Sequence, residues 1–361
     1  MIQACIQIGA KIRTHDHGLE IDGVSGAPHT PENIIDAGNS GQVLRFIGAI
    51  AGLMPDYTVI TGDHSIRHHR PVAPLLSGLL QLGCFAVSTK QDGKAPIIIK
   101  GPLQGGKIEV DGQDSQPISG LIIASAFASS PIEIHVKNPG ELEWVGLTLS
   151  WLKRLGIPFQ TQDFVYYQLF GQAQYPGFHY QVPADFSSAA FPIIAACVTH
   201  SQIKIQHLDM NEPQGDKKLI ELLIKHGLSI EMNEHTMTID ARDFVIPGMQ
   251  VDVNIMIDAL PILAVLACFA QSESLLYGAS IARHKESDRL AAITQELTKM
   301  GAKIEEEADS LKILPAVLHG AEVFSHHDHR IAMALAVAGM GALGETKILD
   351  TTCIDKSFKG F

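Results

Sequence analysis

The stretch Leu297-Thr-Lys-Met-Gly-Ala-Lys-Ile304 reads as the end of one helix followed at once by a strand. Apolar residues recur at helical spacing before its glycine: Leu290, Ile293, Leu297 and Met300. A glycine directly after a helix is a common C-cap, because it adopts the left-handed backbone that ends many helices. One such glycine predicts only a helix end.

The same pattern occurs five times along the chain. Its copies are IQIGAKI (6–12), LLQLGCFAV (79–87), LKRLGIPF (152–159), LIKHGLSI (223–230) and LTKMGAKI (297–304). Their glycines, which are separated by 74, 73, 71 and 74 residues, are Gly9, Gly83, Gly156, Gly227 and Gly301. Even spacing over five copies predicts an internal repeat.

Each period also contains a second helix, whose start is marked by a residue with a capping side chain. These predicted caps are Asn39, Ser115, Asp185, Asp258 and Asp328. A strand follows each of these helices, so we expect the repeating unit to be strand, helix, strand, helix, strand, strand. Helix N-termini present free backbone N–H groups and therefore suit anions.

The first copy of the repeat is incomplete. Met1 lies inside the helix that ends at Gly9, so the strand, helix and strand expected before that helix have no counterpart. The sequence therefore predicts two α/β domains, an N-terminally truncated one at residues 1–183 and a second at 184–361. The apolar surface left by the missing unit predicts self-association or poor solubility.

The composition limits the classes of function. The chain has 361 residues, of which 46% are hydrophobic, and a net charge of −12. This charge argues against broad nucleic-acid binding, which needs clustered Lys and Arg. The longest apolar run, 259–270, is too short to span a bilayer. The five dispersed cysteines have no C-x-x-C spacing, so we expect reduced thiols and a cytoplasmic protein.

Charge is concentrated at residues 283–289, RHKESDR, where an amphipathic helix is expected to begin. The buried face of that helix needs none of these charges. One interpretation is a solvated first turn in which Glu286, Ser287 and Asp288 complement the helix dipole. The other is that the charges line a cleft that binds an anion.

Seven motifs occur along the chain in the same order as in one known family: DAGNSGQVLRF (36–46), GDHSIRHHRP (62–71), DSQPISGLI (114–122), IDALP (257–261), RHKESDRL (283–290), HHDHRIAMA (326–334) and DKSF (355–358). From Met1 to Phe361 the chain resembles the enolpyruvyl transferases, and most closely the EPSP synthase family. The resemblance implies a two-domain inside-out α/β barrel of repeated units. It also implies transfer of the enolpyruvyl group of phosphoenolpyruvate to the 5-hydroxyl of shikimate 3-phosphate, in the shikimate pathway, with no metal or organic cofactor.

The resemblance also implies roles for individual residues. It assigns catalysis to Asp258, Glu286 and Lys356. It assigns phosphoenolpyruvate binding to Asn39, Gly41, Arg70, Gln116, Arg289, His329, Arg330 and Lys356. It assigns shikimate-phosphate binding to Ser115, Gln116, Asp258 and Lys285. Phosphoenolpyruvate carries a carboxylate and a phosphate, and guanidinium groups suit both. We therefore expect Arg70, Arg289, Arg330 and Lys356 to converge in one cleft, whereas plain N-caps remain the local interpretation of Asp258 and Asp328.

The chain departs from the family on the shikimate-phosphate side. The family's N-terminal Lys-Ser and following Arg have no counterpart, its Ser-Ser-Gln reads Asp114-Ser115-Gln116, and Glu141 aligns where a serine is expected. A carboxylate beside a phosphate is repulsive unless a cation intervenes. We therefore expect this chain alone to be inactive or nearly so, and to bind phosphoenolpyruvate more readily than shikimate 3-phosphate.

Three alternatives remain open at this point. A non-catalytic or split remnant of the family would keep the fold and one anion-binding cleft. An enzyme acting on UDP-N-acetylglucosamine is disfavoured, because GDHSIRHHRP lacks the reactive cysteine usual in that sister family. A metal site is disfavoured too, because His64 and His68 would share a face only in a helix and no Cys or Glu stands at ligand spacing beside them.

Overall fold

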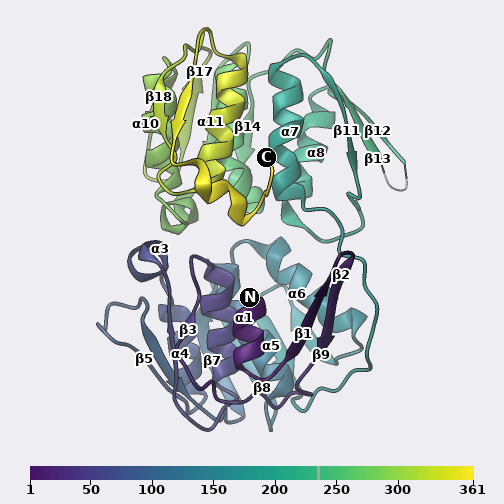
Figure 1. The fold of residues 1–361 in the computed structure, drawn as a ribbon, viewed down its shortest axis with the longest axis vertical. Helices are drawn as coiled ribbons and strands as arrows, with labels where there is room; N and C mark the ends of the chain where they lie inside the picture. Colours follow the sequence, from purple (N-terminus) through teal and green to yellow (C-terminus); the bar gives the residue numbers. More distant parts are fainter. Residues whose placement is uncertain (234–235) are drawn as a thin grey trace. The chain divides into compact units, whose positions relative to one another are not determined.

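The chain folds into two compact units, Met1–His179 (unit 1) and Tyr180–Phe361 (unit 2) (Figure 1). The structure is a computed structural model, and it describes residues 1–233 and 236–361. Each unit mixes helices with short strands, as the α/β prediction requires. The domain boundary predicted between residues 183 and 184 lies close to this division and stays a prediction.

Unit 1 contains ten strands and the helices between them. Its elements are α1 (Ile2–Gln7), β1 (Lys11–His15), β2 (Gly18–Asp22), β3 (Ile35–Asp36), η1 (Val43–Ile47), α2 (Gly48–Ala51), β4 (Thr58–Thr61), α3 (His64–His68), α4 (Ala73–Gln81), β5 (Phe85–Ser88), β6 (Ile97–Lys100), β7 (Gly106–Asp111), α5 (Ser115–Phe127), β8 (Ile132–Lys137), α6 (Leu142–Arg154), β9 (Phe159–Gln162) and β10 (Tyr166–Leu169).

Unit 2 continues the same alternation. Its elements are α7 (Phe186–Val198), β11 (Gln202–Gln206), η2 (Gly215–Lys217), α8 (Lys218–Lys225), β12 (Ser229–Met232), β13 (Thr236–Asp240), β14 (Gln250–Asp252), η3 (Val253–Ala259), α9 (Leu260–Cys268), β15 (Ser274–Tyr277), η4 (Ser280–His284), α10 (Arg289–Lys299), β16 (Lys303–Glu306), β17 (Leu311–Leu314), β18 (Glu322–Phe324), α11 (His329–Gly341), β19 (Lys347–Leu349) and η5 (Thr351–Lys356).

The sheets confirm the predicted repeat. Three of them have four strands in one common arrangement, a parallel pair followed by two antiparallel strands: β3-β4-β6-β5, β7-β8-β10-β9 and β14-β15-β17-β16. A fourth sheet has the order β11-β13-β12. The remaining strands form two pairs, β1-β2 and β18-β19. The predicted unit of strand, helix, strand, helix, strand, strand is therefore present.

The five periodic glycines are confirmed as helix ends. Each stands two residues after the last residue of a helix and has a positive φ: Gly9 +110°, Gly83 +80°, Gly156 +71°, Gly227 +95° and Gly301 +95°. A residue with a Cβ is disfavoured in this left-handed region, which explains why glycine recurs at this one point of the repeat.

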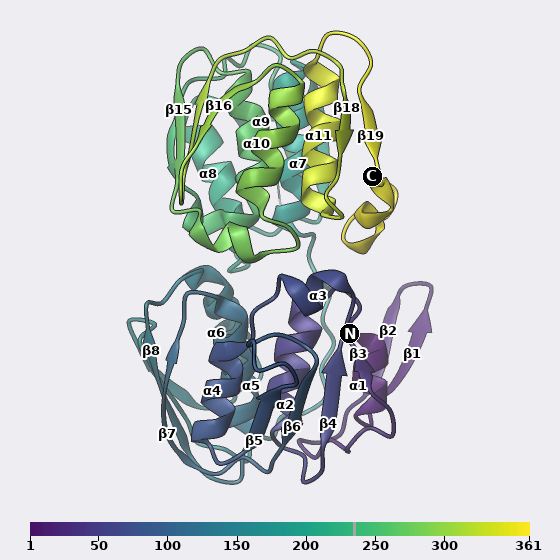
Figure 2. The same ribbon diagram turned by 90° about the vertical axis from the view of Figure 1, so that its left-hand side faces the viewer.

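The core of unit 2 is built on helices that are apolar on every side. All nine residues of α9 are buried, and α9 contacts both α7 and α11 (Figure 2). A helix that is hydrophobic all round must be enclosed by protein, and these contacts enclose α9. In unit 1, α5 has a similar place and contacts α2 and α4. No helix within residues 1–233 and 236–361 is long and apolar enough to cross a bilayer.

The predicted N-caps are only partly right. Asp185 and Asp328 do cap α7 and α11, accepting backbone N–H groups of the first turn. Ser115 is wrong by one residue, because the carboxylate of Asp114 caps α5. Asn39 is also wrong by one residue, because the Ser40 hydroxyl accepts the Val43 N–H at 3.2 Å.

A helix was predicted to start within residues 283–289, and α10 begins at the last residue of that range, Arg289. The charges before it therefore lie in a connecting segment. Asp288 caps α10 and pairs with Arg283, so this part of the solvated first-turn interpretation is correct. Lys285 and Arg289 are buried instead, which the same interpretation does not explain.

Replacing the periodic glycine Gly156 by alanine tests the repeat directly. No atom lies within 4 Å of a Cβ added there, so the cost is the left-handed backbone alone, about 1–2 kcal/mol. Gly177→Ala is a matched control in unit 1, since it also meets no atom and has no positive φ. Urea unfolding should show a loss for Gly156→Ala and none for the control. Equal stabilities would contradict the capping role.

Candidate active site

One guanidinium holds three carboxylates together in unit 2. Arg289, at the first residue of α10, is only 1% exposed. Its Nη1 lies 2.7 Å from Asp258 Oδ1, its Nη2 lies 2.6 Å from Glu286 Oε2, and its Nε lies 2.8 Å from Asp328 Oδ2. The two predicted catalytic carboxylates, Asp258 and Glu286, are thus fixed by the same cation.

Asp258 is bound by two arginines instead of capping α9. Besides the Arg289 contact, its Oδ2 lies 3.1 Å from Arg330 Nη2. The residue before α9 is Ala259, and it makes no side-chain cap. Burial opposes ionisation of Asp258, but the charges of Arg330 and Arg289 outweigh it and hold the pKa of this carboxyl well below its usual range. The N-cap interpretation of Asp258 is therefore wrong.

The Asp328 carboxylate makes two sets of contacts. Its carboxylate accepts the Arg330 N–H at 2.9 Å as the cap of α11, and it also binds Arg289 and the Ser287 hydroxyl. The cap orients Arg330, whose Nη2 donates to Ser187 Oγ at 2.8 Å. The start of α11 thereby connects the Arg330 guanidinium to the start of α7.

The other predicted residues of unit 2 differ in exposure. Lys285 is buried, and so is His329, whose pKa burial lowers to about 4. His329 is therefore neutral at physiological pH and offers an anion a hydrogen bond, not a charge. Lys356, in η5, is exposed, and η5 packs against α11.

Asp216 is a carboxylate that our sequence analysis missed. It lies in η2, is 1% exposed, and neither of its oxygens has a hydrogen-bond partner within the described residues. Burial raises the pKa of Asp216 to about 8, and the neighbouring negative charge of Asp258 adds to this rise. It is therefore protonated at neutral pH, beside an aspartate that is ionised. Its only sequence signal is a single acidic residue after Gly215 at the start of a helix.

In unit 1, three of the predicted residues meet around Gly41. A Cβ added to Gly41 would lie 2.9 Å from Gln116 Oε1 and 3.4 Å from Arg70 Nη1. It would also lie 2.7 Å from Nη1 of Arg45, which our sequence analysis did not select. A Cβ there would displace the ends of the Arg45 and Gln116 side chains, so glycine at this position allows their close approach.

Arg45 is the buried cation that organises this part of unit 1. It is 0% exposed, within the π-helical turn η1, and donates to Gln116 Oε1 at 2.9 Å and Pro71 O at 2.8 Å. Its Nη2 lies 2.8 Å from Asp114 Oδ2. The negative charge that Asp114 adds to the site is therefore compensated by a cation. A lone arginine among the apolar residues of DAGNSGQVLRF was the available signal.

Glu141 occupies the donors of Ser115 at the start of α5. Its Oε2 accepts the Ser115 N–H at 3.0 Å and the Ser115 hydroxyl at 2.9 Å. Glu141 is 3% exposed and has a left-handed backbone. A protein carboxylate therefore lies where a free helix N-terminus would hold an anion.

Residues 64–68 of the GDHSIRHHRP segment form the short helix α3. His64 and His68 share a face of α3, with ring centroids 4.3 Å apart. Within residues 1–233 and 236–361, no group of three or more His, Cys, Asp or Glu residues is arranged to hold a metal ion. All five cysteines are free thiols.

The structure thus forms two clusters, one in each unit. Unit 2 brings together Asp258, Glu286, Arg289 and Arg330, and unit 1 brings together Gly41, Arg70 and Gln116. Arg70 belongs to unit 1 and the other three predicted cations belong to unit 2. Their convergence in one cleft stays a prediction.

Comparison with known proteins identifies one family over the whole chain. The family model for EPSP synthase (3-phosphoshikimate 1-carboxyvinyltransferase) matches residues 1–361. The 3-phosphoshikimate 1-carboxyvinyltransferase of Chlamydia caviae is 44% identical over 366 aligned residues, which span all of this chain and 81% of that protein. The protein of the same name from Acetivibrio thermocellus is 37% identical over 360 residues and is covered to 84%.

The fold agrees with a solved structure of an EPSP synthase. The EPSP synthase of Acinetobacter baumannii superimposes with a TM-score of 0.79 at 26% identity. The superposition covers 99% of this chain and 84% of that chain.

The Asp216→Asn variant should change how stability depends on pH. The folded-state pKa of Asp216, about 8, lies above the ordinary value of 3.8, so its proton stabilises the fold at low pH and this stability is lost as the pH rises from about 4 to about 8. The amide does not titrate. The free energy of unfolding of Asp216→Asn, measured by thermal unfolding, should therefore fall less over this pH range than that of the unmodified chain, by on the order of a few kcal/mol. Asp243→Asn, at an exposed site, is the control. Parallel pH profiles for all three proteins would contradict the assigned pKa.

Proposed function

Because the chain belongs to the EPSP synthase (3-phosphoshikimate 1-carboxyvinyltransferase) family, we propose that it transfers the enolpyruvyl group of phosphoenolpyruvate to the 5-hydroxyl of shikimate 3-phosphate, with release of phosphate. The observation that carries this proposal is the cluster in which one buried guanidinium, Arg289, holds both Asp258 and Glu286. Two carboxylates fixed side by side suit a reaction that moves two protons.

The reaction is an addition followed by an elimination. The substrate hydroxyl loses its proton as its oxygen bonds to the central carbon of phosphoenolpyruvate, and the terminal vinyl carbon gains a proton. Phosphate then leaves, and the methyl group returns a proton to restore the double bond. We assign Asp258 to the hydroxyl and Glu286 to the vinyl carbon, with Lys356 as a second candidate for proton transfer.

The state of Asp258 defines what it contributes. Its depressed pKa keeps it ionised, so it accepts a hydrogen bond from the hydroxyl and orients it, but it is a weak base. Arg330 shares Asp258 and therefore couples this orientation to the start of α11. Arg289 positions both carboxylates in addition to its proposed contact with phosphoenolpyruvate.

Phosphoenolpyruvate binding is assigned to both clusters. From unit 1 we propose Asn39, Gly41, Arg70 and Gln116, and from unit 2 we propose Arg289, His329, Arg330 and Lys356. The close approach that Gly41 allows to Arg70 and Gln116 supports the first set. The burial of Arg330 supports the second, because a buried guanidinium interacts with an anion in a low dielectric.

Shikimate 3-phosphate binding is assigned to Ser115, Gln116, Asp258 and Lys285, and we propose that it is the weak step. Both donors of Ser115 are bound to Glu141, so a phosphate there must displace a carboxylate. The ion pair between Asp114 and Arg45 removes the repulsion expected from Asp114. Glu141 is then the principal obstacle to this substrate among the residues that depart from the family pattern.

Three further proposals concern the domains, the cellular location and self-association. We propose that the units correspond to domains 1–183 and 184–361 of an inside-out α/β barrel, which the mutual contacts of the buried helices α7, α9 and α11 support. A cytoplasmic location remains a prediction from the five dispersed cysteines. Self-association through the exposed apolar surface of unit 1 remains a prediction.

A phosphate-release assay tests the function. We expect slow release that requires both substrates, and a fall of about 10²-fold or more in Asp258→Asn, since that residue acts on the hydroxyl. Asp243→Asn should leave the rate unchanged. Release that is indifferent to Asp258→Asn would contradict the site. Phosphoenolpyruvate binding without any release at saturating shikimate 3-phosphate would favour a non-catalytic member of the family.

Replacing Glu141 by serine tests the weak step separately. The change frees the Ser115 donors and removes one negative charge, so the affinity for shikimate 3-phosphate should rise about tenfold, while the affinity for phosphoenolpyruvate stays constant. Glu143→Ser, in the first turn of the same helix α6, is the matched control. Calorimetric titration of each ligand decides this, and an unchanged affinity for shikimate 3-phosphate would mean that Glu141 is no obstacle.

A further inference from the structure

The short segment between η4 and α10 carries three side chains that are largely buried. Residues 285–287 lie between the end of η4 and the cap of α10. Lys285 and Ser287 are buried, and the Glu286 side chain is 11% exposed. Glu286 contacts Arg289 at 2.6 Å. The position of this segment therefore sets the position of a proposed catalytic carboxylate.

Arg283 closes the segment into a loop. Its Nη1 donates to Asp288 Oδ1 at 3.1 Å and to Asp288 Oδ2 at 2.9 Å. Asp288 also accepts the Ala291 N–H at 3.1 Å as the cap of α10, so the ends of the segment are joined at the start of this helix. Residues 284–287, the 284–287 loop, are thus enclosed between two residues that bind each other.

The same guanidinium fastens the 284–287 loop to the hairpin formed by β16 and β17. Its Nη2 donates to Glu307 O at 2.6 Å, its Nε donates to Ala308 O at 2.8 Å, and its Nη1 lies 2.9 Å from Glu306 Oε1. Two of these acceptors are backbone carbonyls, which move only with the hairpin. A planar guanidinium holds such acceptors in fixed directions. The loop is therefore held in place relative to the sheet β14-β15-β17-β16.

The contacts of Arg283 are separate from those of the proposed active site. In the part of the chain that the structure describes, its partners are Asp288 and residues 306–308, and Glu286 is not among them. The Arg283 side chain is 24% exposed, whereas that of Arg289 is 1% exposed. Because salt and water screen a partly exposed charge, Arg283 acts on the cluster mainly through the backbone of the loop.

We propose that Arg283 is a positioning residue for Glu286, because it holds the 284–287 loop where the Glu286 carboxylate meets Arg289. The inference deepens the proposed function and rests on it for the role of Glu286 in proton transfer. A group that transfers a proton must lie within hydrogen-bond reach of its target. A misplacement of about 1 Å can cost a rate factor of about 10². Arg283 thus supports the reaction through a residue that it does not touch.

A double-mutant cycle tests the positioning without relying on catalysis. Urea unfolding is measured for the unmodified chain, Glu286→Gln, Arg283→Gln and the double variant. The solution contains about 1 M salt, where the Debye length is about 3 Å and direct attraction between Arg283 and Glu286 is screened. Glu286→Gln removes a charged contact of the buried Arg289 and should lower the midpoint. In the Arg283→Gln background we expect about half this loss or less, because the carboxylate no longer meets Arg289. Residues that do not touch usually contribute additively, so a merely structural role of Arg283 predicts equal losses.

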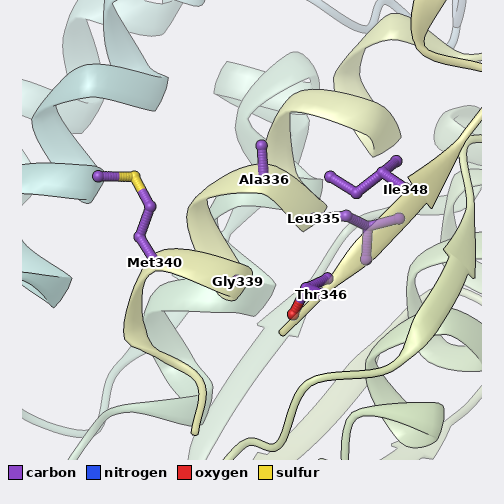
Figure 3. Close-up of a pocket in the computed structure, with 6 residues that line it drawn as sticks. All are labelled: Leu335, Ala336, Gly339, Met340, Thr346 and Ile348. Carbon is purple, nitrogen blue, oxygen red and sulfur yellow. The ribbon is translucent and has the colours of Figure 1, made fainter. Parts of the chain in front are cut away.

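A control for general destabilisation comes from a cavity in unit 2. The cavity of about 200 Å³ between α11 and β19 is lined by six residues, none of which belongs to the 284–287 loop or to the hairpin: Leu335, Ala336, Gly339, Met340, Thr346 and Ile348 (Figure 3). Ile348→Ala removes apolar contacts there and should also lower the midpoint. Its cycle with Glu286→Gln should be additive. If the Glu286→Gln loss shrinks as much in this background, the proposal is overturned.

Phosphate release tests the consequence for the reaction. Arg283→Gln should lower kcat about tenfold or more, because Glu286 is misplaced. The KM for phosphoenolpyruvate should stay nearly constant, since the 284–287 loop carries no residue assigned to that substrate. Arg242→Gln, which breaks an exposed ion pair with Asp240, is the matched control and should leave kcat unchanged.

Two outcomes of these measurements overturn the proposal directly. One is an equal midpoint loss for Glu286→Gln with and without Arg283. The other is an unchanged kcat for Arg283→Gln in an active chain. If the unmodified chain releases no phosphate, the proposed function fails, whereas the double-mutant cycle still decides whether Arg283 positions Glu286.

Discussion

Binding of three carboxylates by the single guanidinium of Arg289 is the interaction on which unit 2 depends. The carboxylates come from η3, from the segment before α10, and from the cap of α11, so one side chain joins three parts of the chain. Burying a guanidinium is costly unless its hydrogen bonds are satisfied, and here each of its three nitrogens contacts a carboxylate. The same contacts leave Asp258 ionised and fixed, so stability and the arrangement of the proposed catalytic groups have one origin.

Those features of the fold that depend on local backbone geometry could be predicted from the sequence. To predict the role of the five glycines, for example Gly227 after α8, it was enough to know that helices often end in left-handed conformations. The caps were less secure, because adjacent capping residues such as Asp114 and Ser115 compete for one position. Asp258 failed as a cap for a different reason. Its carboxylate is bound by arginines distant in sequence, and such tertiary contacts leave no local pattern.

Site residues that belong to recognisable motifs could be predicted from the sequence, whereas residues whose role depends on their burial could not. Gly41, Gln116 and Arg70 were selected by motif order, and the structure brings them together. Arg45 and Asp216 were missed because their sequence signals, a lone arginine in an apolar segment and one acidic residue at a helix start, do not by themselves show that the side chain is enclosed. The raised pKa of Asp216 depends on that enclosure, so its protonation could be recognised only from coordinates.

The π-helical turn η1 makes the first cluster dependent on residue count as well as residue type. A π-turn contains one residue more than an α-turn, and in η1 that turn carries Arg45 between Gly41 and the helix α2. Deleting Val43 or Leu44 would let the helix close to a regular α-turn, in which each residue advances about 100° around the axis. The guanidinium would then rotate away from Gln116 even with every side chain of the cluster conserved. The relative placement of these groups is thus encoded as a length, and point substitutions alone cannot reproduce or repair it.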